Sequence, residues 1–279
     1  MGNSILIVGG VSLDVLHLPD GRTVEAPGGA GLYTALGAAR AGARVTLLAP
    51  RPEPLPAPLL PVLRYLTWRG PAIAPARLMR LEIAHHGGGR ATLLNADWGA
   101  VAEMPPAALP LALRAWSSVH VAALGAAARQ LEFLTAARAR GARVISAGTY
   151  ARAVSGETET VRALWAQADL FFLNENEAQG LFGSAAAARA RPGGRLFITL
   201  GERGVLVAEA AQTTLVPGQP QPEVDPTGAG DVFCGAVLAG LARGLEALAA
   251  AAAAMPLAAR QVTAVGPAAL LAPHGAEPD

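Results

Sequence analysis

Short apolar runs alternate along this chain with longer stretches of helical periodicity, and this alternation constrains the fold more than any other feature. The runs are typical of buried strands and occupy residues 4–11, 43–49, 118–124, 142–147, 169–174, 195–201 and 204–209. The clearest helical stretches between them are Ala-, Leu- and Arg-rich and cover 29–41, 126–140 and 157–167. Continuous apolar strands that alternate with helices predict a mainly parallel sheet covered by helices on both faces.

Two segments break this alternation and predict β-hairpins. Residues 16–27 contain a turn signal at Asp20-Gly21, and residues 77–98 contain one at Gly87-Gly88-Gly89. Both segments alternate apolar with polar residues, as strands with one face in water do. We therefore expect a single domain over residues 1–279 with a small β lid, and this lid is also the expected contact of a possible homodimer.

Composition excludes several classes of function. The chain has 279 residues, of which 52% are hydrophobic and 15% charged, so a sizeable buried core is expected. All 22 of its basic residues are Arg, the net charge is +1 and no basic block occurs, which argues against a nucleic-acid surface. The absence of Lys excludes a Walker P-loop and a Schiff-base lysine.

The remaining composition signals concern redox state and location. The single cysteine, Cys234, cannot form an internal disulfide, and no Cys/His cluster has zinc-site spacing. The N-terminal residues do not match a signal peptide, and no apolar run is long enough to span a bilayer. We expect a cytoplasmic protein that binds no membrane.

The stretch "EVDPTGAGDVFCGAVLAGLARG" at 223–244 places two carboxylates, Asp225 and Asp231, around a loop of small residues that enters a helix. Free N–H groups and the helix dipole favour an anion there, and Gly228, Ala229 and Gly230 let a phosphate approach the backbone closely. Asp231 has two interpretations. It stabilises its own helix by ~1 kcal/mol as a first-turn acid, or it takes the proton from a hydroxyl that attacks a phosphoryl group.

Residues 225–231, "DPTGAGD", resemble the C-terminal signature of the PfkB, or ribokinase-like, family of small-molecule kinases. The resemblance implies a ribokinase-like three-layer α/β sandwich with a mainly parallel central sheet and a small β lid. It also implies that Asp231 is the catalytic base, that Gly228, Ala229 and Gly230 form the anion hole, and that the cofactors are ATP and Mg2+.

Two further motifs are similar to those of this family. "NENE" at 174–177 resembles an Asn-x-x-Glu motif, which implies Asn174 and Glu177 as residues near the metal. "TLGERG" at 199–204 resembles a Thr-x-Gly turn, and the resemblance implies nucleotide contacts at Asn174, Thr199, Gly201 and Thr227. Each motif also has a purely structural interpretation: a helix start capped by Asn174 in the first case and a tight hairpin in the second.

Near the N-terminus, "GGVSLDVL" at 9–16 places Asp14 just past the first predicted strand, where family members bind substrate hydroxyls. "APGGAGLYTALGAARAGARV" at 26–45 resembles the family's Gly-Gly motif and the helix after it, which implies that Gly28, Gly29 and Tyr33 face the acceptor. Tyr33 stands where sugar-kinase members usually carry Asn. This departure predicts a pocket for a cyclic polyol or nucleoside and poor use of ribose and fructose.

The expected reaction is transfer of the γ-phosphoryl group of ATP to a hydroxyl of a sugar, cyclic polyol or nucleoside. One alternative is a non-catalytic sensor of the same fold that binds nucleotide or sugar, but an intact Asp231 argues against it. Another is a dinucleotide-dependent oxidoreductase, because "GAGLYT" resembles a dinucleotide fingerprint. Thr34 occupies the third glycine position of that fingerprint, which argues against the oxidoreductase hypothesis.

Overall fold

A nine-stranded sheet forms the centre of the computed structural model, in which residues 2–272 are described. Its strand order is β15-β14-β13-β12-β11-β10-β1-β4-β6. In chain order these strands are β1 (Ser4–Val8), β4 (Arg44–Leu48), β6 (Thr67–Arg69), β10 (Ser118–Val121), β11 (Ile145–Gly148), β12 (Leu170–Asn174), β13 (Arg195–Thr199), β14 (Gly204–Glu209) and β15 (Gln212–Pro217). Every pairing from β13 to β6 is parallel, and only β14 and β15 join antiparallel. The predicted mainly parallel sheet is confirmed.

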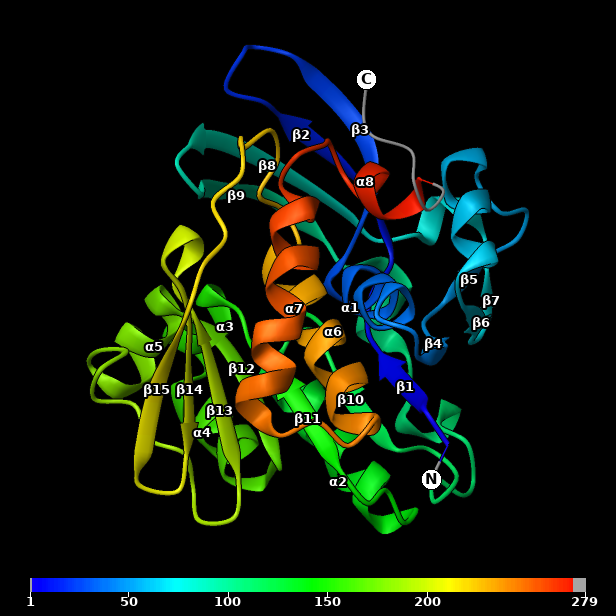
Figure 1. Ribbon diagram of the computed structural model, residues 1–279. Coiled ribbons are helices and arrows are strands. Elements are labelled where there is room, and N and C mark those ends of the chain that lie inside the picture. The colour runs from blue at the N-terminus through cyan, green and yellow to red at the C-terminus, as the bar shows by residue number, and fades with distance from the viewer. Residues whose placement is uncertain (1, 273–279) are drawn as a thin grey trace.

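Helices cover both faces of this sheet, which gives the predicted three layers (Figure 1). One face packs against α1 (Ala30–Arg40), α6 (Ala229–Ala242), α7 (Ala247–Gln261) and α8 (Ala268–Leu271). The other packs against α2 (Ala127–Ala139), α3 (Ala151–Gly156), α4 (Thr158–Gln167) and α5 (Glu175–Phe182). Neighbouring strand residues alternate between the two cores: Phe172 faces the first and Phe171 the second. Both faces are apolar because both are buried.

A separate four-stranded sheet of order β3-β2-β8-β9 lies above the carboxyl ends of the parallel strands (Figure 1). Its strands are β2 (Ser12–His17), β3 (Thr23–Gly28), β8 (Arg80–Gly87) and β9 (Arg90–Asp97). The predicted turns at Asp20-Gly21 and Gly87–Gly89 occur between these strands, and a parallel β2–β8 pair joins the two hairpins. The small β lid is thus present.

The first hairpin begins earlier than predicted, at Ser12 instead of residue 16, because Ser12 to Leu16 already pair with β3. Asp14 is consequently a residue of a lid strand and does not lie in a loop after β1. The segment between β4 and β8 adds β5 (Arg51–Pro52), which pairs with β7 (Ala72–Ile73), at the edge of the molecule.

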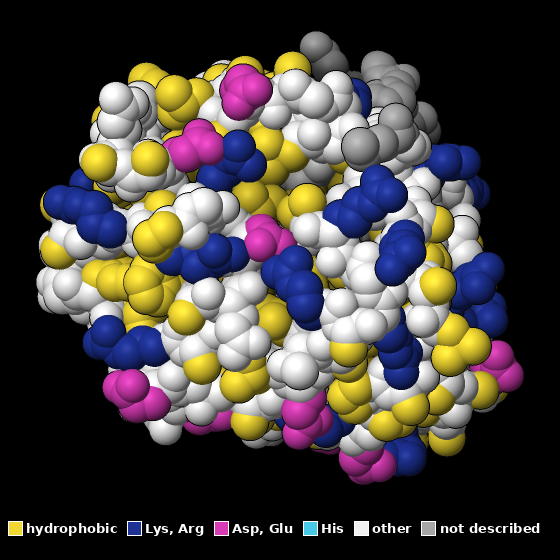
Figure 2. Space-filling view, turned by 90° about the horizontal axis from the view of Figure 1, so that it is seen from below, with side chains coloured by type: hydrophobic (Ala, Val, Ile, Leu, Met, Phe, Trp, Pro, Cys, Tyr) yellow, Lys and Arg dark blue, Asp and Glu magenta, His cyan; other side chains and the backbone are white. Residues whose placement is uncertain are grey.

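The face opposite the lid is shown in Figure 2, where arginines are scattered with acidic side chains between them. This face is not the continuous basic surface that nucleic-acid binding requires. Within residues 2–272, none of the helices has the length and apolar character needed to cross a membrane.

Candidate active site

A cavity of about 890 Å3 opens between the carboxyl ends of the parallel strands and the tip of the lid. Its walls come from the ends of β10 to β13, the start of α6, the side of α7, the segment 219–223 and the lid tip. Ligands of parallel α/β sheets bind at this edge. Eight of the predicted site residues line the cavity: Asn174, Glu177, Thr199, Gly201, Gly228, Ala229, Gly230 and Asp231.

The anion loop, residues 225–230, leads into α6. Its residue Gly228 is the N-cap of this helix and has a left-handed backbone conformation, with a φ of 75°. A glycine is required there, because a Cβ at Gly228 would lie 2.2 Å from Tyr33 Cγ and L-residues avoid this φ. Gly228, Ala229 and Gly230 line the cavity at the start of α6, where the first N–H groups have no acceptor within the helix, although Ala229 N donates to Pro226 O (3.3 Å). The loop therefore has the geometry that binds an anion.

Asp225 holds the anion loop in shape from inside the protein. Its side chain is fully buried, its Oδ1 accepts a hydrogen bond from Thr227 N (2.9 Å), and its Oδ2 accepts one from Gly266 N (2.7 Å). Gln261, at the end of α7, adds a hydrogen bond from its Nε2 to Thr227 O (3.1 Å). Asp225 is thus a structural residue, whereas Asp231 projects into the cavity wall.

Asp231 lies in the first turn of α6 with no ion-pair partner among the described residues. Burial raises the pKa of its carboxyl to about 7. A carboxylate with a pKa near neutrality and an open cavity beside it suits proton transfer from a hydroxyl.

Asn174 and Glu177 form a capping box at the start of α5. Asn174 Oδ1 accepts from Glu177 N (2.9 Å), while the Glu177 carboxylate accepts from Asn174 N (2.9 Å) and Asn174 Nδ2 (2.8 Å). Burial, with a smaller contribution from the nearby Asp231 carboxylate, raises the pKa of Glu177 to about 8. The structural interpretation of this motif is correct, and both residues nevertheless line the cavity.

The Thr-x-Gly turn lies beside the capping box because β12 and β13 are neighbours. Asn174 and Thr199 are register partners at the carboxyl ends of these strands. Thr199 also approaches the anion loop, since a Cβ at Gly230 would lie 3.9 Å from its Oγ1. The turn does join two antiparallel strands, β13 and β14, so the hairpin interpretation is correct as well.

The residues predicted to face the acceptor lie behind the cavity wall and are not among its lining residues. Asp14 is 1% exposed, accepts a hydrogen bond from Leu81 N (3.2 Å), and has a pKa that burial raises to about 7. Gly28 leaves room for that carboxyl, because a Cβ there would lie 1.9 Å from Asp14 Oδ2. Tyr33 is 1% exposed, and its hydroxyl has no hydrogen-bond partner in residues 2–272.

Two residues of this site were not predicted from the sequence. His85, on lid strand β8, places its Nε2 3.1 Å from Thr227 Oγ1 and 3.3 Å from Asp225 Oδ1. Gln261 was not predicted because it lies at the end of an alanine-rich helix and belongs to no recognisable motif. His85 carried one available signal, since alternation along β8 turns it inward and its neighbour His86 outward.

The residues present fit a magnesium ion only in part. Among residues 2–272, no three His, Cys, Asp or Glu side chains lie where they could hold one metal ion together. The carboxylates of Glu177 and Asp231 repel each other when both are ionised, and a nearby cation would reduce this electrostatic repulsion. Magnesium is commonly held by one or two carboxylates together with waters and substrate phosphates, and Glu177 supplies one such carboxylate in the cavity lining.

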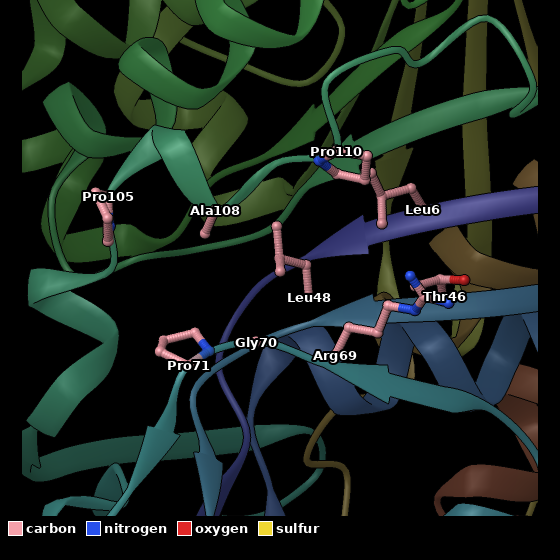
Figure 3. Close-up of a pocket in the computed structure, with 9 residues that line it drawn as sticks. All are labelled: Leu6, Thr46, Leu48, Arg69, Gly70, Pro71, Pro105, Ala108 and Pro110. Carbon is pink, nitrogen blue, oxygen red and sulfur yellow. The ribbon is translucent and has the colours of Figure 1, made fainter.

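A second cavity, of about 470 Å3, lies on the far side of β1 and β4. Figure 3 shows Leu6 and Leu48 facing the loop that carries Pro105, Ala108 and Pro110 across it. Its lining contains no carboxylate, so it has no group suited to acid–base chemistry. The first cavity is therefore the candidate active site.

Comparison with known proteins agrees with this geometry. Residues 80–274 match the family model described as pfkB family carbohydrate kinase. The chain belongs to this family. A cytidine kinase of Thermococcus kodakarensis is 30% identical over 249 residues, which cover 86% of this chain and 89% of that protein.

Solved structures show the same fold at lower identity. A ribokinase from Cryptococcus neoformans in complex with ADP superimposes with a TM-score of 0.77, at 21% identity over 95% of each chain. An adenosine kinase from Sinorhizobium meliloti superimposes with a TM-score of 0.75, at 19% identity over 95% of each chain. The predicted ribokinase-like fold is confirmed.

Membership of the pfkB family establishes the class of reaction. The protein is an ATP-dependent small-molecule kinase, a phosphotransferase with an alcohol group as acceptor. Nothing in the comparisons favours the non-catalytic sensor, and the dinucleotide-dependent oxidoreductase is excluded by the family.

Proposed function

We propose that this kinase phosphorylates a nucleoside and that Asp231 is its general base. The observation that carries the proposal is the position of Asp231, whose carboxylate lies in the cavity wall one residue after the anion loop. Its pKa near 7 leaves a substantial ionised fraction at neutral pH and makes that carboxylate basic enough to accept a proton.

The proposed reaction has one chemical step. The acceptor hydroxyl gives its proton to Asp231 as its oxygen attacks the γ-phosphorus, and the bond from that phosphorus to the β-phosphate bridging oxygen breaks to release ADP. Negative charge on the transferring phosphoryl oxygens is stabilised by the N–H groups of Gly228, Ala229 and Gly230. These groups are already oriented by the helix, so no reorganisation is needed as charge develops.

We assign the nucleotide to the part of the cavity between β13 and α7. Thr199 and Gly201 line this part and would bind its phosphates or ribose, and the apolar side of α7, with Met255 and Ala258, would contact the adenine. Thr227 is not a lining residue, and its proposed nucleotide contact would be made from the anion loop beside the cavity. Magnesium would be held through water by Asn174 and Glu177, because the capping box already occupies the oxygens of both side chains. When bound, it would neutralise phosphate charge.

The acceptor is assigned to the lid side of Asp231, with Asp14, Gly28, Gly29 and Tyr33 in the wall behind it. Similarity to a cytidine kinase over most of the chain supports a nucleoside, and the aromatic ring at Tyr33 in place of a small amide supports an acceptor other than ribose. Tyr150 adds an aromatic side chain to the lining of the cavity.

The experiment is an ADP-release assay with cytidine, uridine, adenosine, inosine, ribose, fructose and myo-inositol as acceptors. We expect the highest kcat/KM with a nucleoside and at least about 10-fold lower values with ribose and fructose, since a lost base contact of about 1.4 kcal/mol already gives that factor. A kcat/KM for ribose above that of every nucleoside would contradict the assignment. ATP binding without turnover of any acceptor would favour the sensor.

The lid is also the proposed contact of a homodimer. Strand β9 is an edge strand of the lid sheet, most of its residues are exposed, and Leu94 within it is 51% exposed. Unpaired edge strands with exposed apolar residues favour pairing with another chain. Light scattering should give a dimer mass for the wild type and a monomer mass for Leu94→Lys. A monomeric wild type would refute this proposal.

A further inference from the structure

Lid strand β8 contacts the anion loop through one fully enclosed side chain, that of His85. The side chain of His85 is 1% exposed and that of Asp225 is 0% exposed. His85 Nε2 lies 3.3 Å from Asp225 Oδ1 and 3.1 Å from Thr227 Oγ1. A single lid residue thus contacts both polar side chains that precede Gly228.

These contacts fix which nitrogen of His85 carries a proton. An ionised carboxylate is only an acceptor, whereas a threonine hydroxyl can accept or donate. A bare Nε2 lone pair would face the Asp225 oxygen, so the arrangement requires a proton on Nε2. His85 therefore acts as a donor placed between two oxygens of the anion loop.

The opposite side of the loop is held by the core. Gly266 N donates to Asp225 Oδ2 (2.7 Å), and Gln261 Nε2 donates to Thr227 O (3.1 Å). His85 supplies the lid-side contact of the same two residues. A second lid contact lies nearby, where Gly89 N donates to the exposed Glu223 carboxylate at 3.0 and 2.8 Å.

We propose that His85 is a positioning residue that couples the lid to phosphoryl transfer. With the lid in place, His85 hydrogen-bonds to Thr227 Oγ1 and makes a polar contact with Asp225 Oδ1. It thereby holds the backbone that orients Gly228 to Gly230 and places Asp231. Without it, the anion loop is held from one side only. This proposal rests on the proposed role of the anion loop and Asp231, because His85 itself does not line the cavity.

The test compares three variants of adjacent residues. His85→Leu removes the donor, and His85→Gln keeps one, since the Gln amide nitrogen stands the same number of bonds from Cβ as His Nε2. His86→Ala is the matched control, because His86 is exposed and its ring, within residues 2–272, bonds only to Thr92 Oγ1 (2.9 Å) on the next strand.

We expect kcat of His85→Leu to fall by about 10- to 100-fold with KM for ATP changed less than about 3-fold, because small misplacement of reacting groups slows chemistry more than binding. His85→Gln and His86→Ala should keep kcat within about 3-fold of wild type. A kcat of His85→Leu equal to wild type, or a His85→Gln variant as slow as His85→Leu, would overturn the proposal.

Amide hydrogen exchange separates this proposal from the assignment of the reaction. Without any substrate, amides of residues 225–230 should exchange faster in His85→Leu than in wild type, His85→Gln and His86→Ala. Equal exchange in all four proteins would overturn the positioning role even if the kinase mechanism holds. If the wild type phosphorylates none of the acceptors but the 225–230 amides still exchange faster in His85→Leu, the positioning role of His85 is supported. Only the assigned reaction is then refuted.

If His85→Leu does not fold, the pair His85→Gln and His85→Asn decides. The Asn amide is one bond too short to reach the loop oxygens, so this variant should lose kcat and exchange protection while Gln retains both. Equal behaviour of Gln and Asn would overturn the proposal.

Discussion

The ring of Tyr33 lies directly against the backbone of Gly228. A Cβ added at Gly228 would stand 2.2 Å from Tyr33 Cγ, and the φ of Gly228 is 75°. The first turn of α1, which carries Tyr33, therefore packs against the anion loop. These two segments lie side by side although almost two hundred residues separate them in the sequence.

The Tyr33 contact predicts that Gly228→Ala is far more costly than a comparable change elsewhere. A left-handed conformation costs a residue with a side chain about 1–3 kcal/mol, and the clash with Tyr33 adds to this. Gly183→Ala is the matched control, because its φ is 82° and a Cβ there meets nothing within 4 Å. Urea unfolding should give a clearly larger loss of stability for Gly228→Ala. Equal losses in the two variants would show that the ring does not press on the loop.

A second prediction concerns the hydroxyl of Tyr33, which is buried without a hydrogen-bond partner in the described residues. An unpaired buried hydroxyl is costly, so Tyr33→Phe should leave the free energy of unfolding unchanged or raise it by about 1 kcal/mol. If the hydroxyl binds the acceptor, KM for the acceptor should rise by about 10-fold with KM for ATP unchanged. An unchanged acceptor KM together with a marked loss of stability would show that Tyr33 has only a structural role.

A third prediction concerns stability against pH. Burial raises the pKa of Asp14 and Asp231 to about 7 and that of Glu177 to about 8. Unfolded carboxyls titrate near about 4, so between about pH 4 and 8 the folded protein binds more protons than the unfolded chain. Stability should therefore fall as pH rises through this window.

Thermal unfolding without nucleotide or metal tests this directly. Tm should be lower at pH 8 than at pH 6, and the difference should be smaller in Asp231→Asn, which has lost one of the three raised carboxyls. A wild-type Tm that rises between pH 6 and pH 8 would contradict the predicted direction.

Much of the fold was predictable because its strands are buried on both faces. Continuous apolar runs such as 169–174 have few other stable environments, and DPTGAGD at 225–231 combines small residues with acids in the pattern of a tight turn that enters a helix. Strand β15 was missed because residues 212–217 are mostly exposed and carry no apolar periodicity. The first hairpin was placed too late because Ser12 and Asp14 are polar residues buried within a strand.

The contacts between distant segments were not predictable. Asp14 was placed just past the first predicted strand, and the sequence does not show that its carboxyl fits against Gly28. His85 is one of five histidines without a motif, and its importance depends on the lid strand lying over Asp225. Sequence patterns report local structure and burial, whereas these contacts depend on how the lid packs against the sheet.

The central claim is that Asp231 accepts the proton of the attacking hydroxyl, and Asp231→Asn tests it most directly. Asn keeps the shape of the side chain and starts a helix nearly as well, but its amide cannot take the proton. We predict that kcat for ADP formation falls by about 100-fold or more. ATP affinity, measured by calorimetry on the folded variant, should stay equal or improve, because a negative charge beside the phosphates is removed. Near-normal turnover of the best acceptor by this folded variant would contradict the account and leave Asp231 as a residue of the helix start.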